Sequence, residues 1–345
     1  MLQDAMTKAD SFKREGWTGL LLSILAGMAG YGVHKITNIA MADPLVVSLL
    51  MGIVIRTATG ENRRLRKGVS LAPRIFIPAG IVFYGAKNLN FAEISLIKAN
   101  TALVMISIAV VYLLVIILLG RLMKQKEQIT YLTATGSAIC GASAIAVTAP
   151  AVDANADDIS ISLIAITLIS VFNLFILFPF IAVLSNVTLQ TYAVLSASVL
   201  PFTGFIEVAI RNSPFLAAES LRNGTAAFAL SLKASKLAGL LVIIPLFSSL
   251  TRKRLYIPWF LWALLASGFV GTMIAGGGSP FYVRTLSPLI VKTYNISWSV
   301  AMAAIGLNAD VKQLLSNNGA KALIMAFAGF IAALITFFML SGMRL

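Results

Sequence analysis

The sequence predicts an all-α integral membrane protein with about eleven transmembrane helices, and three observations carry this prediction. Of the 345 residues, 59% are hydrophobic and only 12% are charged, with a mean hydropathy of +0.90. Soluble domains have roughly 25% charged residues. The third observation is the spacing of the apolar runs, because short polar segments separate runs near the roughly 20 residues that a membrane span needs. No room remains for a sizeable soluble domain.

Taken in order, the chain begins with the polar residues 1–16, which we expect to be a cytoplasmic lead-in and not a cleaved signal peptide. Residues 17–345 then form a single transmembrane domain. Its apolar runs are bounded by charged residues, Gly, Pro or Asn. They lie at about 17–34, 44–57, 74–89, 99–120, 129–150, 159–184, 191–208, 221–250, 257–275, 285–307 and 319–342.

The loop charges give these runs a direction. With the N-terminus in the cytoplasm, 17 Lys and Arg residues fall inside and 8 outside, which favours an inner (plasma) membrane protein with the N-terminus inside and the C-terminus outside. In this arrangement the acidic segment around Asp153, Asp157 and Asp158 lies outside. The net charge of +14 therefore reflects cytoplasmic loops, and nucleic acid is not an expected partner, since no aromatic residues interleave the basic clusters.

An odd number of runs is typical of one leading helix followed by two five-helix repeats of opposite orientation. We expect these repeats at about 44–184 and 191–342, so that 129–150 corresponds to 285–307. Both segments carry Gly, Ser, Thr or Asn residues, and we predict that both are interrupted helices. A competing local match pairs residues 85–90 with 306–310 in a different register, and the sequence leaves this alternative open.

The most informative stretch is 136–145, in which seven of ten side chains are no larger than that of serine. Small residues allow a helix to unwind at mid-membrane, where backbone amides could bind an anion. They equally allow a tight helix-packing seam. The candidate substrate-binding residues here are Gly136, Ser137, Cys140, Gly141 and Ser143.

The motif SAICGASAI at 137–145, together with residues 44–56, 258–260 and 301–307, resembles the YeiH-like sulfate exporter family over essentially the whole chain. That family resembles the superfamily of bile-acid/sodium-symporter-like transporters, whose fold has inverted five-helix repeats and two crossing discontinuous helices. The resemblance implies a transporter of sulfate, sulfite or a small organosulfonate. It indicates the class of protein more firmly than the substrate.

Polar residues inside the predicted spans are the second signal. Lys233 and Lys236 lie three residues apart, on one face of a helix, and a lysine in the membrane usually faces a cavity or a partner. The alternative is that they extend to the interface. Asn173 and Asn308 are further candidates for the same site or for helix bridging, whereas Tyr84 is expected at the membrane interface.

These features favour a secondary transporter of a small anionic solute that exposes a central site alternately to each side. An anion channel and an intramembrane enzyme are the alternatives. One histidine and one cysteine give neither a metal cluster nor a nucleophile with its base, so we expect no enzyme, no metal and no cofactor, with Na⁺ or H⁺ left open as a coupling ion. The expected partners are the solute and the lipid bilayer, with a homo-oligomer also open.

Overall fold

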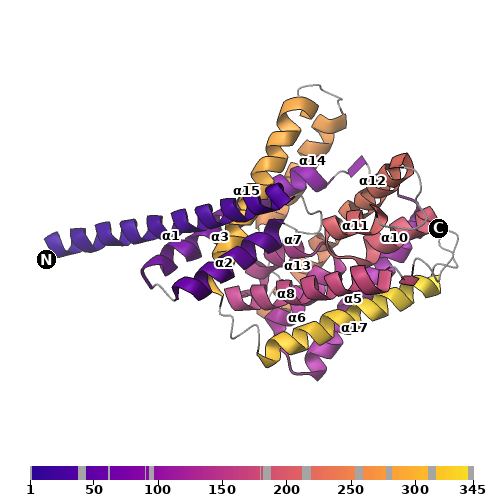
Figure 1. Cartoon of the computed structure of the whole chain (residues 1–345), viewed down its shortest axis with the longest axis horizontal. Coiled ribbons are helices and arrows are strands. Elements are labelled where there is room, and N and C mark those ends of the chain that lie inside the picture. The colour runs from indigo at the N-terminus through magenta and orange to yellow at the C-terminus, as the bar shows by residue number, and fades with distance from the viewer. Residues whose placement is uncertain are drawn as a thin grey trace.

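The computed structural model describes residues 2–37, 44–60, 63–89, 91–92, 97–178, 180–181, 188–211, 219–252, 259–276, 282–309 and 316–340. Within these ranges every regular element is a helix, and no strand is present. Figure 1 shows the long N-terminal helix α1 (Leu2–Thr37) extending beyond the rest of the bundle. The all-helical membrane architecture predicted from the sequence is confirmed.

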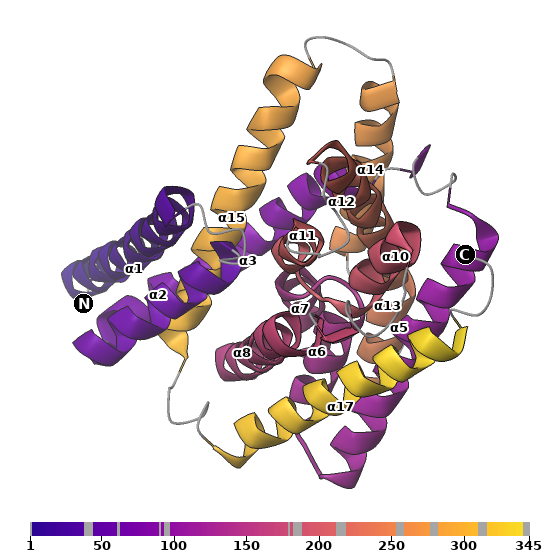
Figure 2. The same cartoon turned by 45° about the vertical axis from the view of Figure 1, so that its right-hand side comes forward.

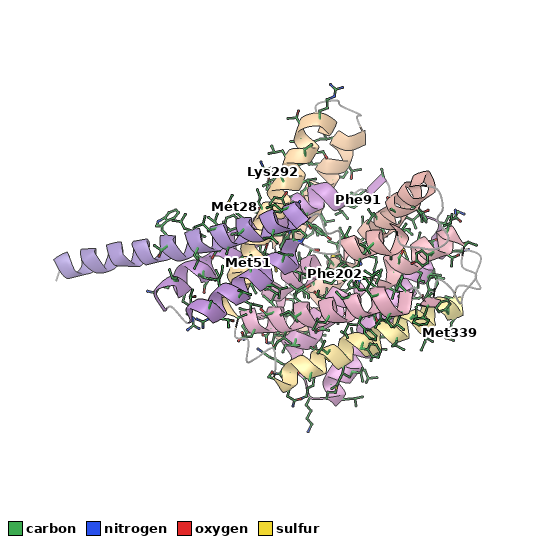
Figure 3. The ribbon with its side chains drawn as sticks, in the orientation of Figure 1. Met28, Met51, Phe91, Phe202, Lys292 and Met339 are labelled. Carbon is green, nitrogen blue, oxygen red and sulfur yellow. The ribbon has the colours of Figure 1, made fainter. Side chains whose placement is uncertain are left out.

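Within the residues that the structure describes, five segments are long and apolar enough to cross a membrane. They are Leu65–Ala86, Ala99–Leu122, Ala156–Leu177, Gly224–Thr251 and Asn317–Leu340. Large apolar side chains such as those of Met28 and Met339 lie on the outer surface, whereas Phe202 lies inside the bundle (Figure 3). An apolar outer surface of this kind suits contact with lipid.

One end of the bundle is marked by basic residues, and we call it the basic end. Arg66, Trp259 and Asn308 line one cavity there. Lys126 pairs with Asp158 at the same end. At the opposite end, the backbone N–H of Phe91 donates a hydrogen bond of 3.1 Å to Thr272.

Nine helical elements of the described chain run between these two ends. They are α1, α2 (Pro44–Thr59), α3 (Arg63–Asn88), α5 (Ala99–Leu122), α8 (Ala156–Phe172) with the π turn η2 (Asn173–Leu177), α12 (Glu219–Ser235) joined through the 3₁₀ turn η3 (Lys236–Gly239) to α13 (Leu240–Arg252), α14 (Trp259–Gly276), α15 (Ser287–Asn308) after the π turn η4 (Tyr282–Leu286), and α17 (Asn317–Leu340).

Two further segments of the described chain form helical hairpins. Each enters the bundle from one end and turns back to that same end. Hairpin 1 consists of α6 (Glu127–Ala138), α7 (Ala142–Thr148) and the 3₁₀ turn η1 (Ala149–Val152). Lys126, which precedes hairpin 1, forms a 2.7 Å ion pair with Asp158, which follows it, so both ends of the hairpin lie at the basic end. Its two arms pack closely, because a Cβ at Gly136 would lie 2.8 Å from the Ile145 side chain.

Hairpin 2 consists of α10 (Leu189–Val199) and α11 (Thr203–Arg211) and starts at the opposite end. The Tyr192 hydroxyl, near the start of α10, donates a 3.2 Å hydrogen bond to the carbonyl of Ala209, near the end of α11. The two arms are therefore antiparallel neighbours. Hairpins 1 and 2 thus enter the bundle from opposite ends.

The hairpins correct part of the predicted topology. The segment 129–150 is interrupted, as predicted, but it turns back and does not cross, and 191–208 does the same. With 12 residues, α6 is about 18 Å long, too short for a hydrocarbon layer about 30 Å thick. The acidic segment around Asp153 therefore lies at the basic end, and its predicted position on the other side of the membrane is wrong.

The prediction of a discontinuous helix at 285–307 is also wrong, because α15 is continuous from Ser287 to Asn308. Its small residues serve close packing against α2. A Cβ at Gly306 would lie 2.2 Å from the Leu49 carbonyl oxygen, and a Cβ at Gly52 would lie 2.2 Å from that of Ala303. Figure 2 shows α1, α2, α3 and α15 on one side of the molecule and α5 and α17 on the other, with α6, α7 and α8 between them.

Candidate functional site at the hairpin tips

The tips of the two hairpins meet inside the bundle. Hairpin 1 turns at Ile139–Cys140–Gly141, and hairpin 2 turns between Val199 and Thr203. A Cβ at Gly141 would lie 2.8 Å from the ring of Phe202 and 3.1 Å from the carbonyl oxygen of Pro201. The two hairpins are therefore in direct contact at their tips.

Gly141 allows hairpin 1 to turn. Its φ of 70° and ψ of −129° are accessible to glycine and strained for other residues. The backbone is held across the turn by a 2.8 Å hydrogen bond from the Gly141 N–H to the Gly136 carbonyl. The predicted unwinding within 136–145 is confirmed at these residues.

A small polar cluster surrounds the tip of hairpin 1. The Ser143 hydroxyl lies 3.3 Å from the Cys140 sulfur and 3.4 Å from the Tyr84 hydroxyl of α3. Tyr84 in turn stacks on Tyr294 of α15, with ring centroids 5.5 Å apart. Tyr84 is thus buried beside the hairpin tip, and its predicted interfacial position is wrong.

Two lysines hold the tip of hairpin 2. The Lys236 ammonium donates a 2.9 Å hydrogen bond to the Ser198 carbonyl, and the Lys233 ammonium donates one of 2.6 Å to the Leu200 carbonyl. Between them, the Tyr112 hydroxyl donates a 3.1 Å hydrogen bond to the carbonyl of Val199. These carbonyls end α10, where a helix has no partners of its own for its last carbonyl groups and its dipole favours cations.

The lysines place two ionisable amino groups in the interior of the bundle. Lys233 is 3% exposed and Lys236 is 7% exposed, so neither extends to the surface. Within the described residues, the only partners of their ammonium groups are the two carbonyls, and no carboxylate pairs with either. An ammonium group has three N–H donors, so each lysine keeps donors for another ligand. A Cβ at Gly239, in the same turn η3 as Lys236, would lie 3.1 Å from the side chain of Ile139, so this turn packs beside the tip of hairpin 1.

A cavity of about 860 Å³ leads from the basic end toward this cluster. It lies between α3 and α15 on one side and η1 and the start of α8 on the other. Its walls include Pro78, six residues before Tyr84, and Ala149, six residues after Ser143. The contact between Tyr84 and Ser143 therefore lies about two helical turns beyond the cavity wall, deeper in the bundle.

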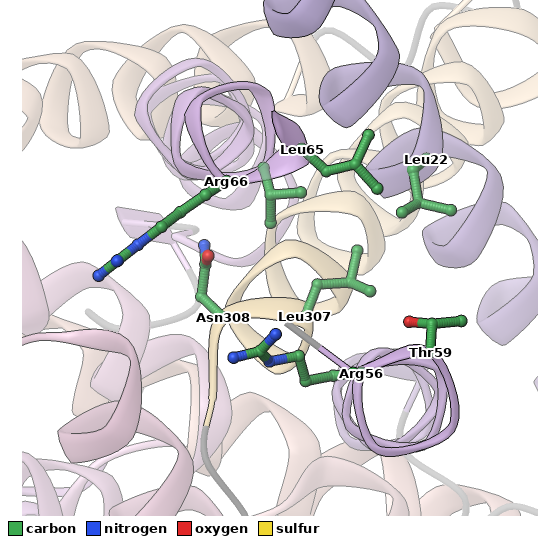
Figure 4. A pocket seen from close by; sticks show the side chains of 9 residues that line it. Leu22, Arg56, Thr59, Leu65, Arg66, Leu307 and Asn308 are labelled. Carbon is green, nitrogen blue, oxygen red and sulfur yellow. The ribbon is translucent and has the colours of Figure 1, made fainter. Parts of the chain in front are cut away.

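The other predicted site residues lie in different places. Gly136 and Ser137 are buried in the last turn of α6, where Gly136 permits the close packing of the two arms. Asn308 ends α15 at the basic end and lines a small pocket with Arg56 and Arg66 (Figure 4). It lies 14 residues after Tyr294 along α15. Asn173 is buried at the start of η2, on the α8 helix.

The structure thus joins Cys140, Gly141 and Ser143 of hairpin 1 with Lys233 and Lys236, and it leaves Asn308 outside this cluster. Sequence reasoning missed Tyr84, Tyr294 and the carbonyl groups of hairpin 2. A tyrosine near the end of an apolar run has the pattern of an interfacial residue, and backbone carbonyls leave no mark in a sequence.

Comparison with known proteins places the chain among membrane proteins. A UPF0324 membrane protein of Archaeoglobus fulgidus is 28% identical over 316 residues, covering 90% of this chain and 88% of the relative. A UPF0324 membrane protein of Bacillus cereus is 24% identical over 333 residues, covering 90% of each. No solved structure matches the chain. The model of the family described as Conserved hypothetical protein 698 matches residues 18–326, so the chain belongs to this family, the YeiH-like family that its motifs resemble.

Proposed function

We propose that the protein is a secondary transporter that carries a small anion across the cytoplasmic membrane, with its basic end in the cytoplasm. The observation that carries this proposal is the buried pair of Lys233 and Lys236 without a carboxylate partner in the described chain. Buried cations without a counter-ion are costly, and an anion bound between the hairpin tips would neutralise them.

The anion would take the remaining N–H donors of the two ammonium groups. The hydroxyl group of Ser143 lies at the facing tip and can donate a further hydrogen bond. Charge-assisted hydrogen bonds of this kind are the stronger ones in proteins. Transport here requires binding and a change of access, with no bond made or broken in the solute.

The arrangement of the helices supports alternating access. We propose two inverted five-helix units, α2 to α8 and α10 to α17, in which hairpin 1 corresponds to hairpin 2. Each unit supplies one hairpin, and the two enter from opposite ends. The cavity at the basic end is the proposed entry path from the cytoplasm, and the contact between Tyr84 and Ser143 separates it from the rest of the site.

Binding and transport by purified protein test this proposal. Lys236→Met and Lys233→Met should each weaken the binding of an accepted anion at least tenfold, since hydrogen bonds to a charged group are worth about 1.5–3 kcal/mol. Lys292→Met, at an exposed position on α15, is the matched control and should bind as the wild type does. Sulfate, sulfite, sulfonates and carboxylates would be screened by thermal shift, with and without Na⁺ and across pH.

Proteoliposomes then separate the mechanisms. Saturable uptake that Lys236→Met abolishes supports a carrier, whereas ion currents far above carrier rates indicate a channel, and chemical change of the solute without net uptake indicates an enzyme. Anion binding that neither lysine variant weakens, in folded protein, would refute the proposed site.

A further inference from the structure

Asn173 is a buried amide without a described partner for its oxygen. Its side chain is 1% exposed, and Oδ1 accepts no hydrogen bond from any described residue. Buried polar atoms in proteins are nearly always hydrogen-bonded, so an orphaned amide oxygen requires a reason, such as a ligand that is bound only part of the time.

Residues on either side of Asn173 contact the two hairpins. Ile166, on the buried face of α8, contacts hairpin 1, since a Cβ at Gly136 would lie 2.9 Å from it. Phe178, which is also buried, packs edge to face against Tyr192 at the base of hairpin 2, with ring centroids 6.0 Å apart. Along the chain, Asn173 lies between these two contacting residues, seven positions after Ile166 and five before Phe178.

The helix that follows hairpin 2 resembles the helix that follows hairpin 1, because both change their winding at a buried polar residue. Lys236 begins the 3₁₀ turn η3, and the buried Lys233 precedes it by three residues. Asn173 begins the π turn η2, and the buried Ser170 precedes it by three residues. In each unit, a hairpin is thus followed by a helix whose regular winding changes at a buried polar residue. π turns of this type frequently mark functional sites.

We propose that Asn173 forms the neutral side of the substrate site and accepts a hydrogen bond from a hydroxyl group of the transported anion. This inference rests on the proposed function, because Lys233 and Lys236 supply the charged side. An amide oxygen attracts a donor and repels an oxyanion. The substrate class is therefore a small hydroxy acid, with a carboxylate or sulfonate at one end and a hydroxyl at the other, in preference to inorganic sulfate, which has no donor.

Matched anions that differ only in the hydroxyl group test this inference. Affinities of the purified full-length protein would be measured by calorimetry for ethanesulfonate against 2-hydroxyethanesulfonate, and for propionate against lactate. We expect the hydroxylated member of at least one pair to bind about tenfold more tightly, as one added hydrogen bond allows. Equal affinities within both pairs, or binding of inorganic sulfate alone, overturn the inference, and this comparison needs no variant.

Asn173→Leu, which keeps the side-chain size, should remove the hydroxyl preference and leave the affinity for ethanesulfonate or propionate within about threefold of the wild type. Asn317→Leu, at an exposed amide on α17, should keep the preference. A preference that persists in Asn173→Leu overturns the inference. Lys236→Met should instead weaken the binding of both anions in each pair. A failure of the proposed anion site and a failure of the proposed role of Asn173 can therefore be distinguished.

Discussion

Gly141→Ala should destabilise the protein because Gly141 is both strained and crowded. Its φ of 70° and ψ of −129° cost a residue with a Cβ about 1–3 kcal/mol. The added methyl group would lie 2.8 Å from the ring of Phe202, which is 1% exposed and has little room to move. Overpacking of this kind costs about 1–3 kcal/mol. We therefore expect a loss of roughly 2–6 kcal/mol in the free energy of unfolding.

The assay is unfolding in mixed micelles with increasing SDS, followed by tryptophan fluorescence. Gly224→Ala is the matched control, because a Cβ at this helical glycine meets no atom within 4 Å. It should be neutral or stabilise by up to about 1 kcal/mol, since alanine loses less entropy than glycine in a helix. If Gly141→Ala and Gly224→Ala unfold at the same SDS fraction, the tight turn at the hairpin tip is refuted.

Two further predictions concern the topology and the packing of α15. In a background where Cys140→Ser removes the single thiol, cysteines introduced as Asp153→Cys and Lys124→Cys should react with an impermeant maleimide from the same side of the membrane, and Lys98→Cys from the other side. Labelling of the first two from different sides would show that hairpin 1 crosses the membrane. Gly306→Leu should lower the free energy of unfolding by more than about 3 kcal/mol in the SDS assay, because its Cβ would lie 2.2 Å from a backbone oxygen of α2; a wild-type unfolding curve would contradict this contact.

Composition and run spacing predicted the helical membrane architecture, and the small residues at 136–145 predicted the interruption at Gly141. Neither signal could distinguish a crossing segment from a hairpin. An apolar run of about 20 residues has the same hydropathy whether it continues or turns back, and the turn depends on the backbone angles of Ile139 and Gly141 and on the pairing of Lys126 with Asp158. That pairing joins residues 32 positions apart, which local periodicity does not reveal.

For Lys233 and Lys236, the sequence predicted the burial of the side chains but not their hydrogen-bond partners. A pair of lysines within an apolar run predicted buried charge, and both side chains are buried. Their partners are main-chain carbonyls of Ser198 and Leu200, exposed only because α10 ends there. At 285–307 the sequence predicted an interruption that the structure does not have. Gly306 and Ser299 suggested a broken helix, whereas α15 is continuous there and Gly306 permits its close contact with α2.

The glycine contacts also favour the competing repeat register, in which the end of α3 corresponds to the end of α15. Near the opposite end, a Cβ at Gly85 of α3 would lie 2.5 Å from a backbone oxygen of α14, and one at Gly271 of α14 would lie 2.6 Å from a backbone oxygen of α3. At the basic end, Gly306 of α15 and Gly52 of α2 make the same reciprocal contacts. The pair α3 and α14 therefore mirrors the pair α15 and α2.

This correspondence matches α5 with α17, hairpin 1 with hairpin 2, and α8 with α12 and α13, each pair running in opposite directions. The second unit then begins with its hairpin, whereas the first unit places its hairpin fourth, so the two orders differ by a circular permutation. The cavity between α3 and η1 at the basic end then has a mirror position between α15 and the end of α11 at the opposite end. In the proposed carrier, an exchange of the roles of the two units would close the first cavity and open the second. We expect the stacking of Tyr84 on Tyr294, one from each of the paired helices α3 and α15, to change with it.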